Sequence, residues 1–182
     1  MDILIQLVVN GLLLGGTLAI ISVGLTLIFG IVRVVNFAHG EFLMVGMYAV
    51  YLLYKYSGMH PYVAVLPAIV ILFIGGALMQ RFIIQPLLSA DPHIQIFATV
   101  GVSTALLNLA LLVFGADEFS VKLNDVSSST IKLGYLTIVS GQLITFCVSI
   151  VLMLLLNWFL HSTYLGRAVR ATAQHRYAAQ LM

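Results

Sequence analysis

The run from Ile3 to Val32 contains no charged side chain, and it constrains the fold more than any other feature of the sequence. A helix needs about 20 predominantly apolar residues to cross a membrane, so this run is long enough for one span. It is too long for the apolar core of a cleaved secretory signal, which has about 7–15 residues and follows basic residues. The only charge before it belongs to Asp2. We therefore predict a retained transmembrane helix.

The composition extends this argument to the whole chain. Of its 182 residues, 62% are hydrophobic and 8% are charged, whereas a soluble domain has about 25% charged residues. Open strands cannot face lipid because their amides would lack partners, so the apolar segments are predicted to be helices. The sequence predicts an all-α integral membrane protein with about five transmembrane helices, at residues 3–32, 34–54, 62–79, 94–114 and 135–160.

The residue content also argues against several functions. A formal net charge of +2 does not provide the basic stripe that binds nucleic acid. Cys147 is the only cysteine, which excludes a disulfide within the chain. The cysteine and histidine spacings of metal sites and the Gly-Lys-Ser or Gly-Lys-Thr of a phosphate-binding loop are absent from the sequence. We expect no metal, no cofactor, no catalytic residue and no nucleotide site of its own in this chain.

The connections between the predicted spans indicate the orientation of the chain. Pro86 and Pro92 are expected to stop helix continuation between the third and fourth spans, and the polar stretch from Gly115 to Gly134 is expected to be a loop in water. Lys and Arg favour the cytoplasmic side of a membrane. A cytoplasmic C-terminus and an outside N-terminus place five arginines inside and three lysines outside: Arg33, Arg81, Arg167, Arg170 and Arg176 against Lys55, Lys122 and Lys132.

Four polar or small residues interrupt the apolar sequence at the predicted start of the second span: Asn36, His39, Gly40 and Glu41. Asn36 can cap free amides at a helix start, and Gly40 lets a neighbouring backbone approach. In one interpretation the cluster is only a capped helix start near the cytoplasmic interface. In the other it lines a substrate pathway or gate, because ionisable groups at membrane depth are costly and tend to be functional. The residues alone leave both interpretations open.

Three separated segments carry a family resemblance. They are GLTLIFGIVRVVNFAHGEFLMVGMYA at Gly24–Ala49, ATVGVSTALLN at Ala98–Asn108 and YLGRAVRATAQHRYAAQLM at Tyr164–Met182. In this order, over nearly the whole chain, they resemble the hallmark segment, a later helix and the cytoplasmic coupling segment of the permease subunits of branched-chain amino-acid ABC transporters. Where this family usually has an acidic residue in the coupling segment, this chain has His175.

The resemblance implies a cell-membrane subunit that imports hydrophobic amino acids. Its implied partners are a second permease subunit, cytoplasmic ATPase subunits and a periplasmic or surface substrate-binding protein. Family members continue with further helices, so the chain is expected to be the first part of a permease and an incomplete bundle. The alternatives are a truncated, non-transporting remnant that at most binds partner subunits, or a permease for urea or short amides. A channel or proton-coupled carrier with His39 and Glu41 as a relay is least favoured, because the predicted spans contain no other carboxylate.

The C-terminal segment 162–182 is predicted to be the coupling segment. Ser162 or Thr163 can cap a short helix there, and Gly166 near its start allows another chain to pack closely. Such a basic tail can also bind anionic lipid, where each Lys or Arg contributes about 1 kcal/mol. The alanines and the resemblance favour ATPase docking, with these candidate residues: Gly166, Arg167, Arg170, Gln174 and His175.

Overall fold

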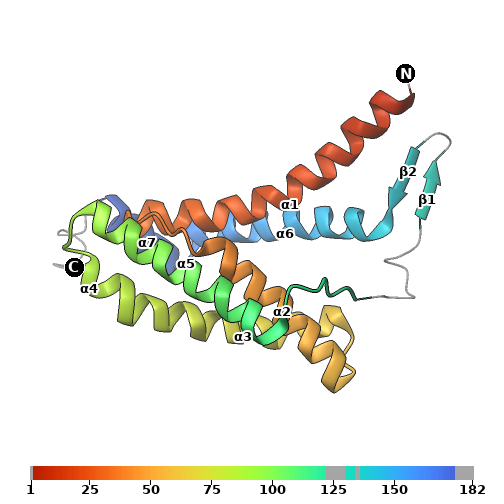
Figure 1. The fold of residues 1–182 in the computed structure, drawn as a ribbon. Helices are drawn as coiled ribbons and strands as arrows, with labels where there is room; N and C mark the ends of the chain where they lie inside the picture. Colours follow the sequence, from red (N-terminus) through yellow and green to blue (C-terminus); the bar gives the residue numbers. More distant parts are fainter. Residues whose placement is uncertain (1, 122–129, 134–135, 175–182) are drawn as a thin grey trace. The chain divides into compact units, whose positions relative to one another are not determined.

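The structure is a computed structural model that describes residues 2–121, 130–133 and 136–174 (Figure 1). Its elements form two compact units, each described separately below. One unit contains α1 (Asp2–Val32), β1 (Thr130–Leu133), β2 (Leu136–Val139), α6 (Ser140–Ser162) and α7 (Tyr164–Gln174). The other contains α2 (His39–Ser57), α3 (Pro61–Met79), the π-helical turn η1 (Gln80–Ile84), α4 (Gln85–Leu87) and α5 (Pro92–Phe114).

Four helices in the described part of the chain are long and apolar enough to cross a membrane: Ile3–Ile31, Pro61–Leu87, Pro92–Phe114 and Ser140–Ser162. Only 6–17% of their most apolar windows is buried inside the protein, so most of their apolar surface requires lipid or another chain to cover it. The predicted class, an all-α integral membrane protein, is confirmed. The helix count agrees roughly with the predicted five, since α2 also forms but carries Glu41 and Lys55 and is less apolar.

The third helical segment extends further than the sequence predicted. We expected it to end near Met79 and Pro86 to stop continuation, but the helix continues through η1 and α4 to Leu87. Proline removes one backbone donor and crowds the carbonyl four residues earlier. A π-helical turn changes the local hydrogen-bond pattern, and such adjustments allow proline inside membrane helices. The turn Gln80–Ile84 lies directly before Pro86, where this adjustment is needed.

Within the unit of α2 to α5, α2 packs against α3 and α5. The small hydrophobic core lies where the segment before α2 meets the end of α3 and the start of α4. Its buried members are Val34, Ala38, Met79 and Ile84, with Phe42, Ile83, Leu88 and Val102 packed against them. Outside this cluster most large apolar side chains of the unit are exposed. The best-packed part of the unit therefore surrounds the polar cluster that the sequence singled out.

In the other unit, β1 and β2 form an antiparallel hairpin with Thr130 opposite Val139. The fifth predicted span included residues 136–139, but these form β2, and α6 begins at Ser140. The Gln6 side chain of α1 contributes to this difference. Its Oε1 accepts the backbone N–H of Thr137 at 2.8 Å, and its Nε2 donates to the Thr137 carbonyl at 2.7 Å. The Gln6 amide thus pairs with the extended backbone of β2 as a neighbouring strand would.

Candidate functional site

The chain leaves the α-helical conformation between α1 and α2. Arg33 has φ +58°, a left-handed conformation that costs a non-glycine residue roughly 1–2 kcal/mol. Asn36 then accepts the Ala38 N–H with its side-chain Oδ1 at 3.0 Å and the His39 N–H with its backbone carbonyl at 3.3 Å. Asn36 was expected to cap a helix that begins there. It does bind a free amide, but it forms a turn that delays the start of α2 to His39.

This turn is fixed to α5 by a buried side chain. Thr99 is 1% exposed, and its Oγ1 lies 3.2 Å from the Val35 carbonyl and 3.0 Å from the Ile96 carbonyl. A hydroxyl has one proton, so the two carbonyls share it. The bond to Val35 satisfies a backbone group that has left the helical pattern. Asn36 itself is 7% exposed, so its side chain is buried in its unit, whereas the neighbouring Val35 and Phe37 are exposed.

The other members of the cluster differ in their surroundings. His39 and Glu41 are half-buried, and Gly40 is exposed. Among the described residues, Glu41 Oε2 is buried without a hydrogen-bond partner, although its position in the first turn of α2 gives the carboxylate a favourable helix dipole. A Cβ added at Gly40 would meet nothing within 4 Å. The close approach predicted at Gly40 is therefore not made within the described chain.

The hollow beside this segment is lined by Val34, Ile83, Ile84, Leu87, Gln95 and Thr99. It has no room for a water molecule. The turn is thus tightly packed on this side, and the structure brings Asn36 and Thr99 to one place while Gly40 faces open space.

The sequence missed two polar residues that hold this region together, Thr99 and Gln95. The Gln95 Nε2 donates to the carbonyls of Leu87 and Ala90, at 2.9 and 3.1 Å, and so closes the connection between α4 and α5. The available signal was a polar side chain inside an apolar helix, which needs an internal partner. Within the described residues, no group of three His, Cys, Asp or Glu side chains could hold a metal ion.

The second candidate site is the junction of α6 and α7. Thr163 Oγ1 accepts the Gly166 N–H at 2.9 Å and donates to the Phe159 carbonyl at 2.7 Å, and the Thr163 carbonyl accepts the Arg167 N–H at 3.0 Å. Of the two predicted caps, the structure therefore selects Thr163. One hydroxyl ends α6 and starts α7.

Gly166 is buried against the end of α6. A Cβ added there would clash with the Phe159 carbonyl oxygen and lie 2.6 Å from Leu160 Cα. These are backbone atoms, which cannot rotate away as a side chain can. We expected Gly166 to admit another chain, but the structure accounts for it by packing within this chain.

The other docking candidates lie on one exposed face of α7. Arg167, Arg170 and Gln174 are exposed and follow a three- and four-residue spacing. The adjacent face carries Gly166, which is buried, and Val169 and Ala173, which are half-buried. The fifth docking candidate, His175, lies outside the described residues.

In the part of the chain that the structure describes, four apolar helices are long enough to span a bilayer, which defines a multi-pass membrane protein. Residues 7–182 match the family described as branched-chain amino acid transport system, permease component, and the chain belongs to this family. It is 28% identical over 93% of its length to the high-affinity branched-chain amino acid transport system permease protein BraD of Pseudomonas aeruginosa, covering 59% of that protein.

Two further relatives extend this comparison. The chain is 28% identical over 98% of its length to the permease protein LivH of Escherichia coli K12, covering 61% of it. It is 29% identical over 91% of its length to a probable branched-chain amino acid transport permease protein LivH of Methanocaldococcus jannaschii, covering 53% of it. The chain thus spans between about half and three fifths of the length of these relatives. No solved structure matches it.

Thr99→Val should loosen the turn before α2, because the Val35 carbonyl loses its donor while the side-chain volume is kept. We expect a loss of about 1–2 kcal/mol in the free energy of unfolding, measured by denaturant titration in detergent micelles. Thr104→Val is the matched control, since the Thr104 hydroxyl bonds only to Val100 in its own helix. Equal effects of the two changes would contradict the proposed link between α5 and the turn.

Gly166→Ala should separate α7 from the end of α6, because the added methyl group meets backbone atoms. Overpacking of this kind costs about 1–3 kcal/mol. Trypsin cleavage after Arg167 and Arg170 should become faster than in the parent protein. Gly101→Ala, where a Cβ meets nothing within 4 Å, should leave this cleavage unchanged. Identical cleavage rates for the parent and Gly166→Ala would show that the junction tolerates the methyl group.

Proposed function

We propose that this chain is a membrane permease subunit of an ABC importer for branched-chain amino acids, with ATP hydrolysis supplied by a separate chain. The observation that carries the proposal is the family match over residues 7–182. The names of the BraD and LivH relatives, which are high-affinity branched-chain amino acid transport permeases, support the substrate class. The apolar helices support a subunit that contributes to a path through the bilayer.

In this proposal α7 and the residues after it dock on a cytoplasmic ATPase. The exposed face of Arg167, Arg170 and Gln174 supports this role, because it presents two guanidinium groups and an amide on a helix whose start is fixed by Thr163. Guanidinium groups form paired hydrogen bonds with carboxylates on a partner surface. The remaining proposed partners are a second permease subunit and a substrate-binding protein outside the membrane.

The segment Asn36–Glu41 is proposed to act as a structural or gating element rather than a direct substrate ligand. Asn36 is buried in a packed turn, which supports positioning over contact with a solute. Glu41 keeps one buried, unpartnered carboxylate oxygen among the described residues. A group of this kind is suited to accept a donor from another subunit or from a second conformation, because leaving it unpaired is costly.

The proposed orientation has the N-terminus outside and the C-terminus in the cytoplasm. It rests on the distribution of Lys and Arg between the connections. Single cysteines introduced in a Cys147→Ser background should report it. Ser57→Cys, at the C-terminal end of α2, should react with a membrane-impermeant maleimide in intact cells, and Gln174→Cys should react only after the membrane is opened. The reverse pattern, or labelling of both sites in intact cells, would contradict this orientation.

Transport can be tested in a chimera in which residues 7–182 replace the matching part of a full-length permease such as LivH, together with its partner subunits. We expect ATP-dependent uptake of leucine, isoleucine and valine, and no uptake of urea. Arg170→Glu in the chimera should reduce co-purification of the ATPase at least about tenfold, because one charge-assisted contact is worth about 1.5–3 kcal/mol.

Lys55→Glu provides the matched charge reversal. In the proposed orientation Lys55 lies on the outer side of the membrane, so this variant should leave ATPase binding unchanged. An inserted chimera that binds the ATPase but carries urea would overturn the substrate class. Retention of the ATPase by Arg170→Glu at both low and high salt would overturn the docking role and favour a lipid contact instead.

A further inference from the structure

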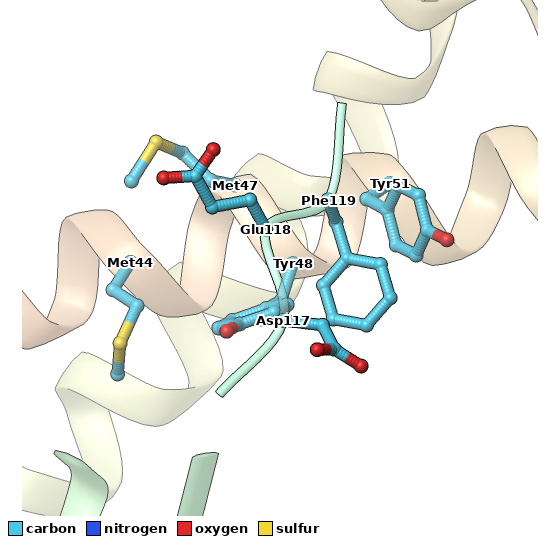
Figure 2. Close-up of a pocket in the computed structure, with 7 residues that line it drawn as sticks. All are labelled: Met44, Met47, Tyr48, Tyr51, Asp117, Glu118 and Phe119. Carbon is cyan, nitrogen blue, oxygen red and sulfur yellow. The ribbon is translucent and has the colours of Figure 1, made fainter. Parts of the chain in front are cut away.

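The residues that follow α5, at positions 115–121, belong to neither a helix nor a strand, and we call them the 115–121 segment. They lie along the side of α2 (Figure 2). Phe114, the last residue of α5, stacks on Tyr48 with 4.1 Å between ring centroids and 7° between planes. Further along the segment, Phe119 packs on Tyr51 at 4.9 Å. These two ring contacts fix the position of the segment on α2.

The contact with Tyr48 also fixes how far along the α2–α3 hairpin the segment begins. The two helices pack antiparallel (Figure 1), and a Cβ added at Gly46 would lie 2.9 Å from Leu72 Cδ1. Two residues further along each helix, Tyr48 is level with Val70. Val70 is the tenth residue of α3 (Pro61–Met79), so at 1.5 Å per residue it lies about 14 Å from the start of that helix. α5 therefore ends beside the interior of the hairpin, away from its tip.

The first half of α3 is itself inside the membrane. The stretch from Pro61 to Leu87 is long and apolar enough to span a bilayer. In its first ten residues, five large aliphatic side chains are exposed: Val63, Val65, Leu66, Ile69 and Val70. They need lipid or an apolar partner around them, which argues against a hairpin that stands in water. The 115–121 segment, which begins level with Val70, therefore starts below the membrane surface.

The composition of the segment does not fit a lipid environment. Residues 115–120 are exposed and include two carboxylates, Asp117 and Glu118, which Figure 2 shows on opposite sides of the segment. Turning the segment about its own axis therefore cannot direct both carboxylates away from lipid. Irregular backbone at membrane depth occurs only where it lines a water-filled cavity or is buried in protein, and ionised side chains at that depth are costly. The exposure of residues 115–120 favours the water-filled cavity.

A hollow of about 390 Å³ beside the segment provides space for this water. Its walls are α2 side chains from Met44 to Tyr51 and, on the other side, Asp117, Glu118 and Phe119. One molecule of liquid water occupies about 30 Å³, so the hollow has room for several. The carboxylates of the segment are thus next to a space in which they can be hydrated.

We propose that the 115–121 segment lines an aqueous vestibule that reaches into the bilayer beside α2. Water in the vestibule solvates the irregular backbone, and Asp117 and Glu118 give the vestibule a negative potential that favours cationic over anionic solutes. The inference rests on the proposed transport function in one respect: in a permease with the proposed orientation, this vestibule is the mouth through which the solute enters from the outer side. The presence of water beside the segment is independent of that function.

Cysteine reactivity in the full chain, in a Cys147→Ser background, tests for this water. Ala116→Cys, within the segment, should react with a membrane-impermeant methanethiosulfonate in intact cells. Val70→Cys is the matched control, because Val70 is 56% exposed and level with the start of the segment. A thiol must ionise to react, and hydrocarbon opposes ionisation, so Ala116→Cys should react at least about tenfold faster than Val70→Cys.

Equal rates at the two positions would overturn the vestibule, because both residues would then lie in the same medium. Ser57→Cys, at the C-terminal end of α2, reports the side from which the reagent arrives. If Ala116→Cys and Ser57→Cys both react only after the membrane is opened, while Val70→Cys stays protected, the vestibule is supported and the proposed orientation is wrong.

Two reagents of similar size, one with a trimethylammonium group and one with a sulfonate, measure the charge of the vestibule. The cation-to-anion ratio of their rates at Ala116→Cys should fall roughly threefold for each carboxylate neutralised by Asp117→Asn or Glu118→Gln, because an exposed charge a few ångströms away acts through water. Asp91→Asn, which keeps the cap of α5 at its other end, should leave the ratio unchanged. A ratio that both neutralisations together do not alter would overturn the proposed lining.

Assembly with the partner subunits provides the last test. In the chimera of residues 7–182 with LivH, with all other cysteines replaced by serine, Ala116→Cys should remain reactive, and its modification should block leucine uptake. Protection of Ala116→Cys on assembly would overturn the proposal, because the segment would then be buried against a partner. A reactive Ala116→Cys in a chimera that transports no amino acid would support the vestibule and contradict the proposed function.

Discussion

A backbone group that faces lipid cannot be solvated, and this constraint determines how the chain uses its few polar side chains. In regular helices the hydroxyls donate to the carbonyl four residues earlier: Thr17, Ser22, Thr26, Thr104, Thr145 and Ser149. These hydroxyls add a second bond to carbonyls that the helix already satisfies, so a polar side chain is carried through an apolar span without an unpaired donor.

Where the helices are interrupted, the same residue types replace missing backbone partners. Asn36 and Thr99 satisfy groups in the turn between α1 and α2, Gln95 closes the connection after α4, and Gln6 pairs with β2. At the α6–α7 junction the Thr163 hydroxyl accepts the Gly166 N–H, which has no helical partner there. The length of the apolar runs thus determines which segments are helical, and a small number of side-chain amide and hydroxyl groups determines where the helices end. The reason is the high free-energy cost of a buried backbone amide without a hydrogen-bond partner.

This difference between apolar runs and single polar contacts explains what could be predicted from the sequence. The apolar runs gave the helical class and the approximate position of α1, α3, α5 and α6, because burial in lipid depends on composition over about 20 residues. The ends depend on single contacts between distant residues. The Gln6 bonds that accompany β2 join residues 131 positions apart, and the start of α2 at His39 depends on the Asn36 turn anchored by Thr99. Neither contact has a periodic signal, so the sequence placed both boundaries several residues away.

Gly40 and Gly166 show why a glycine in a motif is ambiguous until its surroundings are known. Glycine inside a helix costs about 1 kcal/mol relative to alanine, so each position needs a compensating reason. Gly166 has one within the chain, because only a hydrogen fits beside the Phe159 and Leu160 backbone. The described chain provides none for Gly40, whose Cβ position is empty.

The packing of Gly166 also fixes the direction in which the exposed face of α7 points. Since Gly166 and the Thr163 cap fix one face of α7 against α6, the neighbouring face, with Arg167, Arg170 and Gln174, is directed outward by the chain's own packing. The exposure of these three side chains therefore needs no partner to impose it. A surface that is already ordered before binding loses little conformational entropy when a partner arrives, which is the physical advantage that the glycine junction would give α7 in its proposed docking role.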